Sequence, residues 1–261
     1  MYNNLLIDLN ESSFKQVSVY SVDFNNKYNG RNIIQDDIFS VIQNYGKQKK
    51  IQIKILKIPS KGKDFLAFTL LKKGNIFVVI NSALAINQQI FAAAHELYHI
   101  RCYFKKEESS LLNGFMQYES DSEKNSEELE ANAFAALLLV PDNALFEQFE
   151  IQKLDKEDIK IADIITLMDV FAVPYRTIVK RLYEVKYIDK SLMNDFLNID
   201  EDLIHSQCRL SNLATRWIVD TGEIDLAGLD AIIKYNSNIL SENRINEDVE
   251  LLEKLKNELV L

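Results

Sequence analysis

The sequence has 261 residues, of which 47% are hydrophobic and 26% charged, and these proportions are typical of a folded globular protein. A formal net charge of -9 argues against a protein that mainly coats nucleic acid, because phosphate binding needs clustered lysine and arginine. We find no signal-peptide pattern and no apolar run of membrane-spanning length, and two cysteines are too few for a disulfide framework. We therefore expect a cytoplasmic protein with free thiols and no membrane contact.

In the first part of the chain the sequence pattern predicts one helix. Residues 1–30 form an N-terminal arm that the pattern leaves unassigned, with only a weak strand signal at 17–22. From residue 32 to 45 apolar residues recur at helical spacing, and Gly46 is expected to end this helix.

A small sheet and a long helix are expected next. Three runs have the alternation or the β-branched and aromatic content of strands: 51–58, 64–71 and 75–81. The last two flank Lys72-Lys73-Gly74, as the strands of a hairpin do. Residues 88–103 contain no glycine or proline and are rich in strong helix formers, so they predict a helix.

The rest of the chain is expected to be helical. Residues 105–125 are charged and rich in serine and predict a flexible loop, after which Asn125 or Ser126 would cap a helix that stops at Pro141. Helical periodicity returns in five later segments: 156–171, 174–185, 200–218, 226–234 and 247–260. One helix, a small sheet and then many helices indicate an α+β fold with an all-helical C-terminal portion.

Residues 95–99, HELYH, have the HExxH pattern, and two of the three histidines of the chain lie in it. On a helix, His95 and His99 project from the same face, so one metal ion can contact both. Imidazole suits Zn²⁺, which in catalytic sites usually takes three protein ligands and a water. Glu96 can act as the general base that removes a proton from this water, and the pattern therefore predicts zinc-dependent amide hydrolysis.

The following helix offers the third metal ligand. Glu127, Glu128 and Glu130 cluster near its start, where carboxylates are also favourable simply because they complement the helix dipole. Glu128 is the candidate ligand, because Asn132 lies four residues later on the same face and can orient a ligand histidine. Glu130 points about 200° round the helix from Glu128.

Other candidate residues also have an ordinary structural explanation. Cys102 is an alternative ligand or redox sensor, although a cysteine there is more often a small core residue. His205 is a candidate oxyanion donor, yet a structural histidine is more common. Three phenols are undecided candidates for the same role, which leaves the oxyanion-stabilising residue unknown: Tyr98, Tyr103 and Tyr118. The basic helix within 161–185 has features of DNA-reading helices, but the net acidity favours packing or substrate docking.

Two segments resemble the signatures AHELxH and ExxANxFAxxLLxP of the ImmA/IrrE-type metallopeptidases: AHELYH at 94–99 and ELEANAFAALLLVP at 128–141. The resemblance covers about residues 30–190. It implies a gluzincin-like zinc endopeptidase with a zincin-type helical core, Glu128 as third ligand and a helix-turn-helix repressor of mobile elements or stress responses as substrate. Tyr98 departs from the small residue usual in the family, and we expect it to crowd the motif helix or partly screen the metal.

The resemblance leads to two hypotheses about function. The first is a zinc-dependent endopeptidase that cleaves a DNA-binding transcriptional repressor without itself binding nucleic acid. The alternative is a regulatory partner that binds metal and a repressor but does not cleave it. For the domains we expect an arm at 1–30, a zinc metallopeptidase domain at 31–190 and a helical C-terminal extension at 191–261, while the oligomeric state is not predicted.

Overall fold

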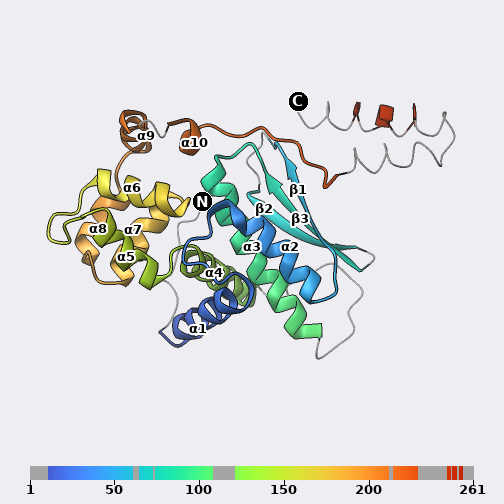
Figure 1. Ribbon diagram of the computed structural model, residues 1–261, viewed down its shortest axis with the longest axis horizontal. Coiled ribbons are helices and arrows are strands. Elements are labelled where there is room, and N and C mark those ends of the chain that lie inside the picture. Colours follow the sequence, from blue (N-terminus) through green and yellow to red (C-terminus); the bar gives the residue numbers. More distant parts are fainter. Residues whose placement is uncertain are drawn as a thin grey trace.

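The computed structural model describes residues 11–60, 65–72, 74–107, 121–211 and 214–228, and short pieces between 246 and 254. In this part of the chain a three-stranded sheet is covered by α2 (Ile38–Gln48) and α3 (Ile86–Glu107), which pack against its strands. Helices α1 (Glu11–Tyr28) and α4 (Asp121–Leu139) lie beyond them, and most of the later helices gather at one end (Figure 1). This arrangement agrees with the α+β fold expected from the sequence.

The sheet has the strand order β1-β3-β2, and all three predicted strands are present. β2 (Ala67–Lys72) and β3 (Asn75–Asn81) form the expected antiparallel hairpin. β1 (Ile53–Ile58) pairs in parallel with the other side of β3, so that β1 and β2 are the two edges. The central strand is the most buried, as the position between two neighbours requires.

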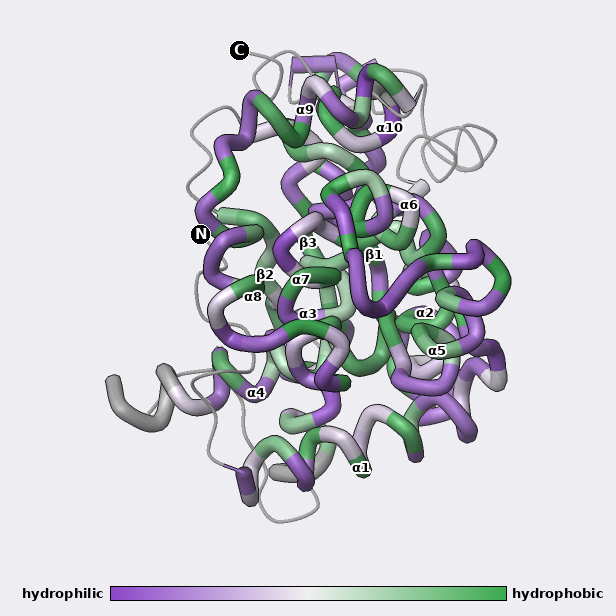
Figure 2. The backbone as a smooth tube through the Cα atoms, turned by 90° about the vertical axis from the view of Figure 1, so that its left-hand side faces the viewer, coloured by the Kyte–Doolittle hydropathy of each residue, from purple (hydrophilic) through white to green (hydrophobic). Residues whose placement is uncertain are grey.

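The weak strand signal at 17–22 is wrong, because these residues lie in helix α1. The buried residues of α1 are Val17, Ser21 and Phe24, and their spacing of three and four positions is that of one helical face. This face packs on α4, and hydrophilic and hydrophobic residues alternate along α1 at the margin of the molecule (Figure 2). Part of the unassigned arm therefore belongs to the core.

Gly46 does not end helix α2, which continues to Gln48. The helix begins later than predicted, after a 3₁₀ turn at Gln35–Asp37. A Cβ atom on Gly46 would lie 2.5 Å from Cγ1 of Ile53 and 2.8 Å from the carbonyl oxygen of Ile51. The glycine is needed because β1 crosses close to the helix, which the sequence pattern alone does not reveal.

α4 begins at Asp121 rather than at the predicted cap of Asn125 or Ser126, and it ends at Leu139, just before Pro141 as expected. The predicted loop at 105–125 is helical at both ends, up to Glu107 and from Asp121, while its central residues lie outside the described part. No single described helix is both long and apolar enough to cross a membrane, although a bent pair made of 126–139 and 142–151 meets the same limits of length and composition.

The C-terminal portion contains more and shorter helices than predicted. They are α5 (Asp142–Ile151), α6 (Ile161–Phe171), α7 (Tyr175–Glu184), α8 (Lys190–Leu197), α9 (Glu201–Leu210) and α10 (Ala214–Ile218). α5 and α8 were not expected, the segment 156–171 becomes helical only at Ile161, and 200–218 is two helices.

After Ile218 the chain runs back along the sheet instead of forming a helix. Asp225 exchanges two backbone hydrogen bonds with Lys57 of β1, and the amides of Thr221 and Gly222 donate to the carbonyl of Ser82. The predicted helix at 226–234 is therefore wrong at 226–228, and the remainder of it lies outside the described residues. The described residues within 247–260 are helical, as predicted.

Candidate metal centre

The HExxH motif lies in the middle of α3, where the helix is most deeply buried. Leading into this helix, the buried side chain of Asn81 accepts hydrogen bonds from the amides of Ser60 and Ala83 and donates to the carbonyls of Ser60 and Phe65. This network ties the end of β3 to two neighbouring segments. The turn that orients α3 is thereby held by satisfied buried polar groups.

Small residues bring α3 and α4 close together. The facing stretches are rich in buried alanines, namely Ala92, Ala93, Ala94, Ala131, Ala133, Ala135 and Ala136. Because alanine has almost no side chain to separate two helices, polar side chains on α4 can reach those on α3. The first turns of α4 that follow Ser126 thus lie against the two histidines.

Two buried imidazoles and one partly exposed carboxylate converge between these two helices. Nε2 of His95 lies 3.1 Å from Nε2 of His99 and 3.2 Å from Oε2 of Glu128, while Nε2 of His99 lies 3.5 Å from Oε1 of Glu128. One ligand atom from each residue can be chosen so that all lie within 4.8 Å of one another. Around a tetrahedral ion with bonds of about 2.0–2.1 Å, neighbouring ligands are about 3.3 Å apart. The donor set therefore fits a metal ion of the size and preference of Zn²⁺.

Helix α4 also contacts the far side of both imidazole rings. Oδ1 of Asn132 lies 2.9 Å from Nδ1 of His95, and Oε1 of Glu127 lies 3.1 Å from Nδ1 of His99. An amide oxygen and a carboxylate are acceptors, so each favours the tautomer with the proton on Nδ1. Nε2 of each ring then offers its lone pair to a metal.

Three carboxylates surround the two buried histidines: Glu96, Glu127 and Glu128. Burial lowers the pKa of His99, but the hydrogen bond to Glu127 and the charges of Glu96 and Glu128 outweigh it and raise this pKa above its ordinary value. A cation between these carboxylates and imidazoles would relieve the same electrostatic imbalance. The electrostatics and the geometry thus favour the same type of ligand.

Glu96 is buried beside the two histidines and receives a hydrogen bond from β2. Oγ1 of Thr69 donates to Oε2 of Glu96 over 2.8 Å. We did not predict a role for Thr69, and its signal in the sequence is small: it is the one hydroxyl residue within the strand run at 64–71. The bond fixes one oxygen of the candidate base.

Tyr98 lies in the core, with a relative exposure of 3% and its hydroxyl donating to Glu130. Burial, the neighbouring Cys102 and the bond to Glu130 raise the pKa of Tyr98, so the phenol stays protonated. The structure thus directs Tyr98 to Glu130 and away from Glu128, so it does not provide the screening of the metal that we expected. Glu130 faces a different neighbour from Glu128, as the helical geometry predicted.

The remaining candidates lie outside the group of possible metal ligands among the described residues. Burial raises the pKa of Cys102 to about 11, which keeps its sulfur a thiol. Tyr103 packs edge-on against Phe104, and His205 lies on α9 beside Glu201. Tyr118 lies outside the described residues, so the oxyanion-stabilising residue remains unassigned.

The basic residues of α7 mostly point into the protein. Lys180 and Arg181 are 2% and 1% exposed, and only Arg176 is at the surface. Nε of Arg181 donates to the carbonyl of Val140 over 3.0 Å, and its other nitrogens pair with Asp142 and Glu184. Two of the three cations of the proposed DNA-reading helix therefore serve packing.

The comparison with known protein families agrees with the motif. The sequence matches the peptidase M78 family model, described as the IrrE N-terminal-like domain, over residues 47–183. Among solved structures, a transcriptional regulator of Mycobacterium tuberculosis is similar with a TM-score of 0.44 and 14% identity, over 65% of this chain and 46% of that one. The chain thus spans less than half the length of that regulator. No curated protein matches the sequence.

Proposed function

Because the chain belongs to the peptidase M78 family, the IrrE N-terminal-like domain family, we propose that it is a zinc-dependent endopeptidase with residues 31–190 as its catalytic domain. The observation that carries the proposal is the convergence of Nε2 of His95, Nε2 of His99 and the carboxylate of Glu128. Bound there, Zn²⁺ would polarise the peptide carbonyl and lower the pKa of a water molecule.

The protein side chains would handle the proton. Glu96, adjacent to both histidines, accepts a proton from the attacking water and passes it to the departing amine. Thr69 holds one carboxylate oxygen of Glu96 and thereby fixes the direction of the other. Glu127 and Asn132 keep the Nε2 lone pairs of His99 and His95 available.

For the substrate we propose a DNA-binding repressor of the helix-turn-helix type, met in the cytoplasm. The support for this is the resemblance of residues 94–99 and 128–141 to peptidases that act on such repressors. The geometry of the metal centre supports peptide hydrolysis as such and does not select one sequence. The C-terminal portion at 191–261 is a candidate for contacts that do.

The test is cleavage of the repressor encoded next to this protein by the wild type and by Glu96→Gln. We expect two defined fragments with the wild type and a rate lowered about 10³-fold in the variant, since general-base catalysis contributes on this order. Zinc content is measured for both proteins, because Glu96→Gln leaves the three ligands in place. Glu147→Gln, an exposed change on α5, is the matched control. Equal cleavage by Glu96→Gln would refute the mechanism.

The non-cleaving regulator remains the alternative outcome of this test. Two features suggest it: a Tyr98 that screens the metal, and the C-terminal extension at 191–261. The Tyr98 hydroxyl is directed to Glu130 within the core, which leaves the extension as its support. Repressor binding with one zinc per chain and no fragments, under conditions in which Glu128→Gln loses the zinc, would favour this alternative.

A further inference from the structure

The sheet has two edges with different surroundings. The β2 edge lies next to the metal centre, since Thr69 contacts Glu96. The β1 edge lies on the other side of β3, against α2 and the returning segment 219–228. A surface at the β1 edge is therefore separate from the chemistry proposed above.

Along β1, the backbone N–H and C=O groups of successive residues point alternately toward β3 and away from it. Gln52 and Ile58 direct their carbonyls toward β3, accepting from the amides of Ile76 and Ser82. Lys57 instead faces outward, where it exchanges both backbone hydrogen bonds with Asp225. Because this direction alternates residue by residue, Ile53 and Ile55 also present their N–H and C=O groups to the outside.

The returning segment covers only the last of these three positions. Ala227 and Gly228 have positive φ angles of 55° and 76°, and the amide of Ala227 turns back to Oδ1 of Asp225. This turn leads the chain off the strand path directly after Asp225. Among the residues that the structure describes, no strand pairs with the outer edge of Ile53 and Ile55.

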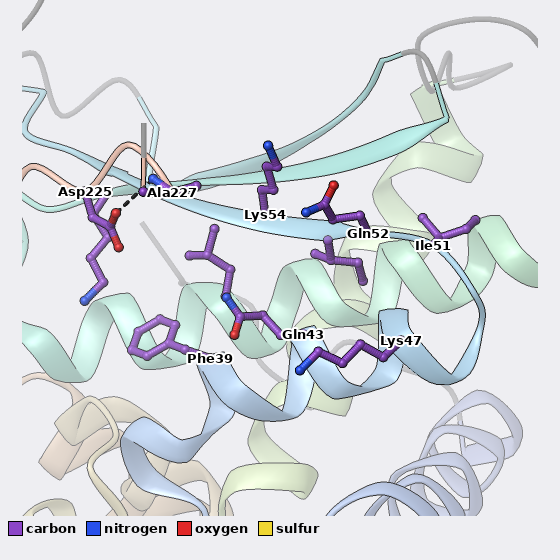
Figure 3. Close-up of a pocket in the computed structure, with 12 residues that line it drawn as sticks. Phe39, Gln43, Lys47, Ile51, Gln52, Lys54, Asp225 and Ala227 are labelled. Carbon is purple, nitrogen blue, oxygen red and sulfur yellow. Dashed lines mark hydrogen bonds between the residues drawn. The ribbon is translucent and has the colours of Figure 1, made fainter. Parts of the chain in front are cut away.

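A groove of about 470 Å³ runs along this open edge. Phe39, Gln43 and Lys47, spaced by four residues on one face of α2, lie below the strand, while Lys54 projects from its other side (Figure 3). A strand laid beside Ile53 and Ile55 would thus direct alternate side chains toward Lys47 and toward Lys54. The amines of Lys47 and Lys54 could then each form an ion pair with an acidic side chain of the added strand.

At Lys57, the next outward-facing residue of β1 after Ile55, the edge is already paired with an acidic segment of the same chain. Lys57 lines the same groove and forms an ion pair of 2.7 Å with Glu223, while Asp225 supplies the neighbouring backbone pairing. An acidic extended segment is therefore what this edge holds where it is covered. The protein as a whole carries a net charge of -9, so three lysines in one groove are a local exception. Pairing of this edge with the same edge of a second copy would bring lysines against lysines and is therefore disfavoured.

We propose that the β1 edge groove binds an extended, acidic segment of a partner protein as an additional strand. The backbone of the segment pairs with Ile53 and Ile55, and its carboxylates meet Lys47 and Lys54. Main-chain pairing provides binding that tolerates sequence changes, and the two lysines provide the selection for acids. The proposal does not require peptidase activity.

The test uses the full chain and a fluorescein-labelled octapeptide of alternating valine and glutamate, with alternating valine and lysine as the opposite probe. We expect binding of the acidic probe alone, weakened about tenfold or more by Lys47→Glu with Lys54→Glu. The control pair Lys72→Glu with Lys190→Glu carries the same charge change elsewhere, and binding should stay within about twofold. No binding of the acidic probe, or equal weakening by both pairs, overturns the proposal.

A second measurement tests the strand pairing itself. Hydrogen exchange at the amides of Ile53 and Ile55 should slow when the acidic probe is bound, with no change at Lys54, whose amide faces β3. Ile55→Pro removes an outward donor and should weaken binding of the probe, and because it also removes a side chain that is only 6% exposed, its fold is checked by thermal unfolding. Unchanged exchange at both isoleucines in the presence of bound probe rejects strand addition even if this proline variant does not fold.

Discussion

The two ends of helix α4 both carry polar clusters built around buried side chains, but the clusters differ in kind. At the C-terminal end the guanidinium of Arg181 donates to the Val140 carbonyl and to two carboxylates, so opposite partners meet. At the other end Glu128 approaches two imidazole nitrogens, and the converging atoms are all of the type that binds a cation. Complementary pairing holds the helix in place, whereas converging lone pairs form a site for a ligand.

The largest effect is expected for the Arg181 cluster at the C-terminal end of α4. Arg181→Met should lower the free energy of unfolding by about 3–5 kcal/mol, because it leaves the Glu184 carboxylate, on a side chain that is 11% exposed, and the Val140 carbonyl without this partner. Urea unfolding measures it. Arg176→Met on the exposed side of α7 is the control, expected within about 0.5 kcal/mol of wild type. A variant at 181 as stable as this control would show that the cluster contributes nothing net.

The next largest effect is expected for Glu128 at the other end of α4. Glu128→Gln keeps the shape of the side chain but removes its charge, so zinc affinity should fall by more than about 100-fold, measured by competition with a chromophoric chelator. Glu130→Gln, two positions along the same helix, should leave the affinity within about twofold because Glu130 pairs with Tyr98. If the two variants bind zinc alike, Glu128 is not the third ligand.

A smaller effect is expected for the carboxylate behind a ligand. Glu127→Gln can still accept a hydrogen bond from Nδ1 of His99 but without a charge, so zinc affinity should fall by about tenfold. The same chelator competition measures it, with Glu130→Gln again as the control. A loss as large as that of Glu128→Gln would mean that Glu127 binds the metal directly.

The smallest effect separates the phenol from the chemistry. Tyr98→Phe removes one hydrogen bond to Glu130 and should cost about 1 kcal/mol of stability in urea unfolding. Zinc affinity and the cleavage rate should stay within about twofold, because the hydroxyl is directed to Glu130 and not to Glu128. A large loss of cleavage with intact zinc binding would instead make Tyr98 part of the catalytic machinery.

Local pattern was most reliable where one element decides the geometry. The strands at 51–58, 64–71 and 75–81 and the motif helix followed from alternation and helix propensity, and the stop before Pro141 followed from proline sterics. The sequence predictions failed where a segment far away in the sequence determines the local structure. Gly46 remains inside α2 because β1 passes over it, and residues 226–228 leave the helical pattern after Asp225 has paired with Lys57.

The sequence by itself determined that His95 and His99 share a helix face, that Glu96 lies beside them and that Glu128 and Glu130 point in different directions, because these relations depend only on helical periodicity. Only the tertiary structure decided which carboxylates reach the imidazoles, that Thr69 holds Glu96 and that Tyr98 turns to Glu130. Such contacts join residues on separate elements, and their distances depend on how closely the alanine-rich faces of α3 and α4 pack, which no local pattern specifies.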